Sequence, residues 1–389
     1  MSDGQETEFD DELEEFAPLS SISAVVHGTD WTTETIVNQI RRGNIILNPQ
    51  FQRRDAWSIP RKSLLIESLI IGLPVPQIVL AESRQDRGKF IVLDGKQRLL
   101  TLLQFWGLAF NEQGESAPNN GFALSRLTLR PVLSRKTFED LSSDFDLEGD
   151  FNALSNQSIR TMVIRNWESD DFLHQVFLRL NTGSVKLSPQ ELRQALHPGQ
   201  FTKYVDEASA GLTSLRELLN ISSPDPRMRD VEILGRYLAF KFFADSYPGR
   251  MKGFLDESFN KFNQGWSRLR DQVVEAVNQF DLGLRSLLEI FNGRPARKPG
   301  SPQFNRAIFD ALIYYQSKES VRDAAEAASA DFIRAYEELF SAGSTFSRAV
   351  ESDTAGRPNT KARFDIWSEQ LSSITGGHVD PPNFPVSEV

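Results

Sequence analysis

The chain has 389 residues, no cysteine and a formal net charge of −10. The lack of cysteine excludes disulfide bonds, thiolate zinc sites and cysteine nucleophiles. Eight acidic residues and no basic residue lie within residues 1–16, so the rest of the chain carries a formal charge of only −2. Net charge therefore does not indicate a nucleic-acid-binding protein, and any surface for nucleic acid must be local.

The apolar pattern predicts helices and short strands as far as about residue 165. Thr32 is a candidate N-cap for a helix that ends at Gly43, and Pro60 opens a second helix that ends at Gly72. Short apolar runs indicate strands at 45–47, 78–80, 90–93 and 161–164. This mixture predicts an α+β domain.

The pentapeptide Asp94-Gly95-Lys96-Gln97-Arg98 has the clearest chemical signature. It lies between an apolar strand and a leucine-rich helix, where the first helical turn offers free backbone N–H groups to an anion. Gly95 permits a sharp turn and a close ligand, Lys96 and Arg98 add positive charge, and Asp94 could hold a metal ion or orient a water. The pattern indicates a phosphate-binding site, although a solvated turn in which Asp94 merely caps the helix explains it equally well.

The loop after the first predicted strand carries Gln52, Arg53 and Arg54, with Phe51 and Trp57 on either side. Such a loop can clamp phosphates through its arginines while an aromatic ring stacks on a base. Alternatively, the two aromatic side chains anchor the loop in the core and the arginines are exposed to solvent. The residue types alone favour neither alternative.

A third candidate segment ends a predicted helix. Asn181 and Gly183 suit a helix C-cap. Asn181, Thr182 and Ser184 could also contact a ligand, but the residue types alone favour the capping role.

From about residue 170 the pattern is mostly helical. Ser188, Pro189 and Glu191 predict a helix start, because they supply an N-cap, a proline at the first helical position and a capping box. Core-facing apolar residues at helical spacing recur further on, at Leu269, Val273, Val277 and Phe280 and at Phe304, Ile308 and Leu312. The four histidines are scattered, so no HNH-like or other metal-nuclease cluster is visible.

Taken in order, these segments resemble the N-terminal domain family of the GmrSD-type modification-dependent restriction systems, whose fold is similar to that of ParB and sulfiredoxin. The resemblance covers about residues 30–260 and rests on the ordered set, not on any one piece. The matching motifs are Pro49-x-Phe51-Gln52-Arg53-x3-Trp57, Ile66-Glu67-Ser68-Leu69-Ile70-x-Gly72-x-Pro74-x-Pro76, Asp94-Gly95-x-Gln97-Arg98, Phe177-x-Arg179-Leu180-Asn181-Thr182-Gly183 and Leu187-Ser188-x2-Glu191-Leu192-Arg193.

The resemblance implies that the chain binds and hydrolyses a nucleoside triphosphate with Mg²⁺, in defence against phage with modified DNA. It implies catalytic roles for Asp94, Gln97 and Arg98, with Asp94 as the candidate metal ligand. The residues expected to bind the nucleotide and its phosphates are Gln52, Arg53, Gly95, Lys96, Arg98 and Asn181.

Two features depart from the family pattern. The family usually has Gln where Lys96 stands, which adds positive charge near the phosphates and puts hydrolysis in question. Complete restriction enzymes of this type also carry a C-terminal HNH-type nuclease domain, whereas residues 270–389 hold a single histidine, His378. The nuclease is therefore expected to be missing here or to be supplied by a partner.

We expect a disordered acidic tail at 1–20, a ParB/sulfiredoxin-like nucleotide-binding domain at 21–168, a helical domain at 169–350 and a partly flexible tail at 351–389. The expected function is that of a nucleotide-binding and nucleotide-hydrolysing sensor or regulatory subunit of an anti-phage restriction-type system. It would act in the cytoplasm, without membrane contact, on DNA and with a separate nuclease or effector subunit. Arg53 and Asn181 are expected to meet the 94–98 turn in one pocket.

Two alternatives remain. The same fold could grip DNA through its basic loops without hydrolysis. A ParB-like nuclease has the least support, because no acidic or histidine cluster is evident beyond Asp94 and Glu67.

Overall fold

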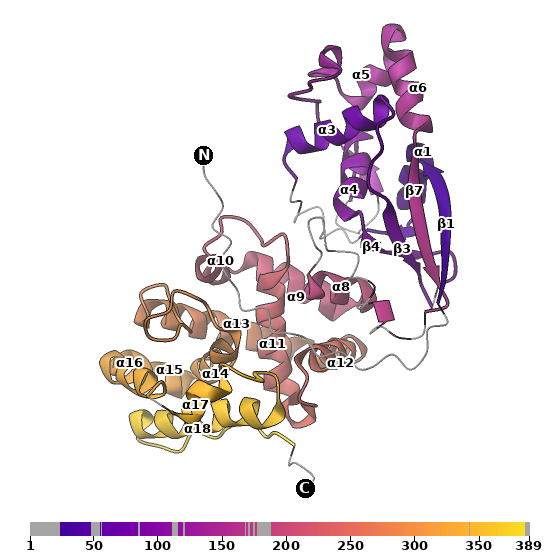
Figure 1. The fold of residues 1–389 in the computed structure, drawn as a ribbon. Helices are drawn as coiled ribbons and strands as arrows, with labels where there is room; N and C mark the ends of the chain where they lie inside the picture. Colours follow the sequence, from indigo (N-terminus) through magenta and orange to yellow (C-terminus); the bar gives the residue numbers. More distant parts are fainter. Residues whose placement is uncertain are drawn as a thin grey trace. The chain divides into compact units, whose positions relative to one another are not determined.

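The computed structural model describes residues 24–47, 55, 57–84, 86–110, 116–119, 121–167, 169, 172–173, 176, 188–341 and 343–385. Its contacts divide the chain into two compact units, one that ends at Leu196 and one that begins at His197. We call them the sheet unit and the helical unit and describe each by itself (Figure 1).

A mixed five-stranded sheet with the strand order β1-β7-β3-β4-β2 is the centre of the sheet unit (Figure 1). These strands span Val25–Thr32 (β1), Ile45–Ile46 (β2), Ile78–Glu82 (β3), Phe90–Asp94 (β4) and Ser158–Arg165 (β7). The β1–β7 and β3–β4 pairs are antiparallel, whereas β7–β3 and β4–β2 are parallel. Two short strands, β5 (Leu108–Phe110) and β6 (Ser116–Pro118), form a separate antiparallel pair. The turn after β4 therefore leaves the interior of the main sheet.

Both faces of the central strands are buried. The helices of this unit are α1 (Thr33–Arg41), α3 (Ile59–Ile70), α4 (Lys96–Phe105), α5 (Phe138–Ser143), α6 (Glu148–Asn156) and α8 (Pro189–Leu196), with 3₁₀ turns at Pro131–Leu133 and Phe145–Leu147. Ala81 and Leu93 belong to a hydrophobic cluster that includes Leu192 of α8. Leu80 and Val92 point to the opposite face, because side chains alternate along a strand, and they are also buried. The central strands are thus covered on both sides, whereas the edge strand β1 is largely exposed.

Local sequence signals are confirmed where they concern single elements. The hydroxyl of Thr32 accepts a hydrogen bond from the amide of Thr35 at 3.2 Å and caps α1. The α+β class with a helical C-terminal part is also confirmed, whereas the likeness to ParB and sulfiredoxin stays a prediction. The sequence analysis did not predict β1, α5 or α6.

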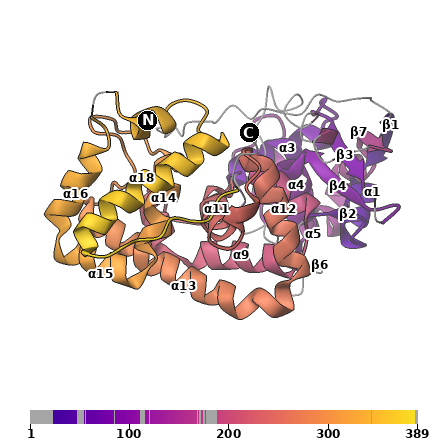
Figure 2. The same cartoon turned by 90° about the horizontal axis from the view of Figure 1, so that it is seen from below.

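The described part of the helical unit consists of helices and the loops between them (Figure 2). The helices are α9 (Gln200–Gly211), α10 (Thr213–Leu219), α11 (Arg229–Phe243), α12 (Met251–Gln264), α13 (Trp266–Ile290), α14 (Arg306–Gln316), α15 (Glu319–Ala327), α16 (Ser329–Glu338), α17 (Thr345–Ala349) and α18 (Arg357–Thr375), with a 3₁₀ turn at Ala244–Ser246. The predicted apolar stripes lie on α13 and α14, where Val273, Phe280, Ile308 and Leu312 are buried.

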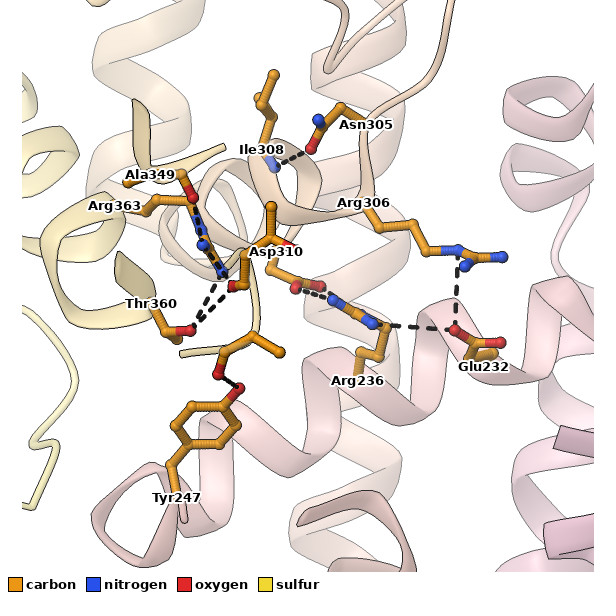
Figure 3. Close-up of polar contacts among 12 residues, drawn as sticks. Glu232, Arg236, Tyr247, Asn305, Arg306, Ile308, Asp310, Ala349, Thr360 and Arg363 are labelled. Carbon is orange, nitrogen blue, oxygen red and sulfur yellow. Dashed lines mark hydrogen bonds and ion pairs between the residues drawn. The ribbon is translucent and has the colours of Figure 1, made fainter. Parts of the chain in front are cut away.

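A buried ion pair joins α11 to α14 (Figure 3). Arg236 donates from Nε and Nη2 to the two carboxylate oxygens of Asp310, at 3.0 and 2.6 Å. Both side chains are almost fully buried, at 2% and 3% exposed. Glu232 lies 3.9 Å from Arg236 and 3.7 Å from Arg306, so the positive charges have acidic partners.

A second buried arginine ties the C-terminal region to the core (Figure 3). Arg363 of α18 donates to the carbonyl oxygens of Ala349 and Thr354, at 2.8 and 2.7 Å. Its neighbours Phe364 and Trp367 are fully buried. The region expected to be a partly flexible tail therefore contains a helix that forms part of this unit's core.

The two compact units meet in the chain between Leu196 and His197, because α8 packs on the sheet. The expected domain bounds stay a prediction. Among the described residues, no helix combines the length and the apolar character that crossing a bilayer requires.

We predict that Asp310→Asn lowers the free energy of unfolding of the helical unit by about 3–5 kcal/mol, because the buried Arg236 charge would lose its bidentate partner and keep only the more distant Glu232. Urea titration measures the loss. The control is Glu257→Gln, which removes an exposed partner of Lys261 and should cost less than about 1 kcal/mol. Equal effects of the two variants would contradict the structural role of the buried pair.

Candidate functional site

The 94–98 turn forms the predicted strand-to-helix junction. Asp94 ends β4, Gly95 has φ +100°, and α4 begins at Lys96. A Cβ atom on residue 95 would lie 3.0 Å from Ile78 Cγ1 and 3.3 Å from Arg98 Nη2. Both the positive φ and the lack of space therefore require glycine here.

The first turn of α4 has no side-chain cap. Gly95 is its N-cap residue and has no side chain to bond the first amides, and no acidic residue lies in the first turn. These amides and the positive end of the helix dipole suit an anion.

Arg98 is buried beside this helix start and is only partly engaged. Its Nη2 donates to Asp94 Oδ2 at 2.9 Å and to the carbonyl oxygen of Gln77 at 2.8 Å. The side chain is 6% exposed, and its Nε has no hydrogen-bond partner among the described residues. The buried Oε1 of Gln97 also has no hydrogen-bond partner among the described residues. Two polar groups of the predicted site thus remain available to a ligand.

Lys96 forms a buried ion pair that the sequence analysis missed. Its ammonium lies 2.5 Å from Glu191 Oε1, and the two side chains are 5% and 4% exposed. The other oxygen of Glu191 accepts the amide of Ser188 at 2.6 Å, and the amide of Glu191 donates to the Ser188 hydroxyl at 3.1 Å. The predicted capping box of α8 is therefore confirmed, and its glutamate also holds the lysine of the 94–98 turn.

A second polar cluster lies further along α4. The ammonium of Lys62 pairs with Asp55 and donates to Gln104 Oε1 at 2.7 Å, and Gln104 Nε2 donates to Asp55 Oδ2 at 2.9 Å. Gln104 stands two helical turns after Gln97, on the same side of α4. The chain just after the predicted Gln52 and Arg53 loop is thereby tied to the helix that carries the turn.

Gln52, Arg53 and Asn181 lie outside the described residues. The expected pocket of Arg53, Asn181 and the 94–98 turn therefore stays a prediction. Glu67, the other acid considered, is buried, and its Oε1 accepts the amides of Leu129 and Arg130 at 2.9 and 2.6 Å. It holds a loop and is not free for metal binding.

The described residues contain no group of three or more His, Cys, Asp or Glu side chains suited to a metal ion. Asp94, with its side chain 19% exposed, is the one predicted metal ligand. Any Mg²⁺ at this turn would therefore need oxygen ligands from the phosphates or water as well.

The family model described as the GmrSD restriction endonuclease, N-terminal domain, matches residues 33–198. This stretch is a GmrSD-type N-terminal domain. It contains the 94–98 turn, the Lys62 cluster and the capping box of α8, and it ends next to the boundary between the two units. The match supports a restriction-system component with a role in anti-phage defence. No curated protein matches the chain.

We predict that Lys96→Met destabilises the sheet unit by about 3–5 kcal/mol, because it leaves the Glu191 carboxylate buried without its cation. The double variant Lys96→Met, Glu191→Gln should recover most of that loss, since glutamine can still close a capping box. Thermal and urea unfolding of the wild type, both single variants and the double variant measure the coupling. A double variant whose loss equals the sum of the single losses would refute the pairing.

Proposed function

We propose that the 94–98 turn binds the phosphates of a nucleoside triphosphate with Mg²⁺ and promotes their hydrolysis. The observation that carries this proposal is the start of α4, where Gly95 provides no side-chain cap and where buried Arg98 Nε and Gln97 Oε1 have no hydrogen-bond partner among the described residues. Backbone amides and a guanidinium together match the charge and geometry of a phosphate group.

Each side chain then has a definite role. Arg98 would donate to a phosphate through Nε while Nη2 stays on Asp94, which keeps the guanidinium oriented. Asp94 would bind Mg²⁺ or the attacking water, and Gln97 would orient the ligand or the water. Phosphoryl transfer needs mainly positioning and neutralisation of charge, which such a set supplies.

The Lys62 cluster supports a contribution from the preceding loop. Asp55 follows Arg53 by two residues and is bonded to Gln104, which stands seven residues after Gln97. Seven helical residues span about 10 Å, and two extended residues span up to about 7 Å. These short spans permit the long side chain of Arg53 to approach a triphosphate at the turn. We propose that Gln52, Arg53 and Asn181 complete the nucleotide site.

At the level of the system, we propose a cytoplasmic sensor or regulatory subunit that couples nucleotide turnover to DNA recognition. The described helical unit has no metal-ligating cluster that could serve a nuclease. DNA cleavage would then belong to a separate nuclease or effector subunit. A chain that binds DNA and shows no hydrolysis with any nucleotide would instead match the binding-module alternative.

We predict that Arg98→Ala abolishes measurable nucleotide binding. Losing charge-assisted hydrogen bonds, each worth roughly 1.5–3 kcal/mol, should weaken affinity by at least about tenfold per bond. Calorimetric titration with Mg²⁺ complexes of ATP, GTP, CTP and UTP, with and without DNA, measures it. The matched control is Arg160→Ala, which removes an exposed arginine paired with Asp30 and should bind like the wild type.

Arg98→Ala should also lower thermal stability, because Asp94 and the carbonyl of Gln77 lose a donor. Unchanged affinity together with lost stability would assign Arg98 to the structure alone and overturn its role in phosphate binding.

We predict that the purified chain does not cleave unmodified DNA in the presence of Mg²⁺, because the described residues offer no multi-ligand metal site. Incubation with supercoiled plasmid and gel electrophoresis measures it. Robust cutting that Asp94→Ala abolishes would support the ParB-like nuclease instead.

A further inference from the structure

Lys96 belongs both to the proposed phosphate site and to an ion pair with Glu191. It is the first residue of α4, at whose start the proposed phosphates would bind. Its ammonium is held 2.5 Å from Glu191, at the start of α8. A phosphate at that helix start would lie next to the ammonium and attract it.

We propose that Glu191 is an internal competitor of the ligand, so that phosphate binding at the 94–98 turn withdraws Lys96 from Glu191 and releases the start of α8. This inference rests on the proposed function of the turn. In the unliganded chain, Glu191 would occupy the cation that the phosphates need.

The release of α8 follows from the cost of a buried charge. Lys96 exchanges one anionic partner for another, so its ammonium stays paired throughout. Glu191 is left with only the amide of Ser188, at a site where its side chain is 4% exposed. A buried carboxylate without its cation is costly, and the cheapest relief is exposure to water. The first turn of α8 must then move away from the turn.

The position of α8 in the chain gives this movement a consequence. α8 ends at Leu196, and the next residue is the first of the helical unit. There the carbonyl oxygen of His197 accepts hydrogen bonds from Thr202 Oγ1 at 2.7 Å and Asn263 Nδ2 at 3.2 Å. α8 therefore connects the phosphate site directly to a fixed point of the helical unit, and its release would signal ligand occupancy.

The test compares Glu191→Gln with the wild type. Glutamine can keep the capping box with Ser188 but carries no charge to hold Lys96. Calorimetric titration with Mg²⁺–ATP, Mg²⁺–GTP and inorganic triphosphate should show about tenfold tighter binding for Glu191→Gln. Hydrogen exchange of the α8 amides in the wild type should become faster when the same ligands are added, and Lys96→Met should lose this response.

Asp150→Asn is the matched control, because it breaks another ion pair of the sheet unit, with Arg130 at 2.7 Å. It should lower stability without changing affinity or the exchange of α8. If the wild type binds these ligands and Glu191→Gln binds them no more tightly, the proposed competition is wrong. Wild-type binding with unchanged α8 exchange would overturn the release, even if the variant does not fold. If the wild type and both variants all fail to bind these ligands, that result refutes the proposed function itself.

Discussion

The ion pair between Lys96 and Glu191 is the interaction on which the arrangement of the sheet unit depends. Both side chains are about 95% buried, so leaving either charge buried without its partner is costly. The pair joins the turn after an interior strand to a helix that follows almost a hundred residues later. Glu191 uses its second oxygen to cap its own helix, so one carboxylate fixes both the position and the start of α8.

The same constraint explains why the 94–98 turn has so little freedom. Gly95 is required by its φ and by Ile78, and Arg98 is oriented by Asp94 and the carbonyl of Gln77. The result is a preorganised helix start, which is what binding a phosphate by backbone amides demands. A contrast within the chain supports this view. Arg236 has acidic partners at all three guanidinium nitrogens, whereas Arg98 is bonded through Nη2 alone among the described residues.

What the sequence predicted correctly is local. Thr32 as a cap, the glycine turn at residue 95 and the capping box at Ser188 are each specified by residues within four positions of one another. β1 was missed because it is an edge strand whose side chains are largely exposed, so it lacks the apolar pattern of a strand. The burial of Arg363 was missed because it depends on distant carbonyl groups.

The pairing of Lys96 with Glu191 could not be read from spacing either, although one signal pointed to it. A lysine at the first position of a helix is unfavourable, because it faces the positive end of the helix dipole. A negative charge nearby offsets this cost, and Glu191 supplies it. The carboxylate thus does for the unliganded protein what a phosphate would do for the complex: it balances the charge gathered at the start of α4. Under the proposed function, an anion site neutralised by Glu191 would be stable when empty, and it would respond to a ligand by giving up that carboxylate.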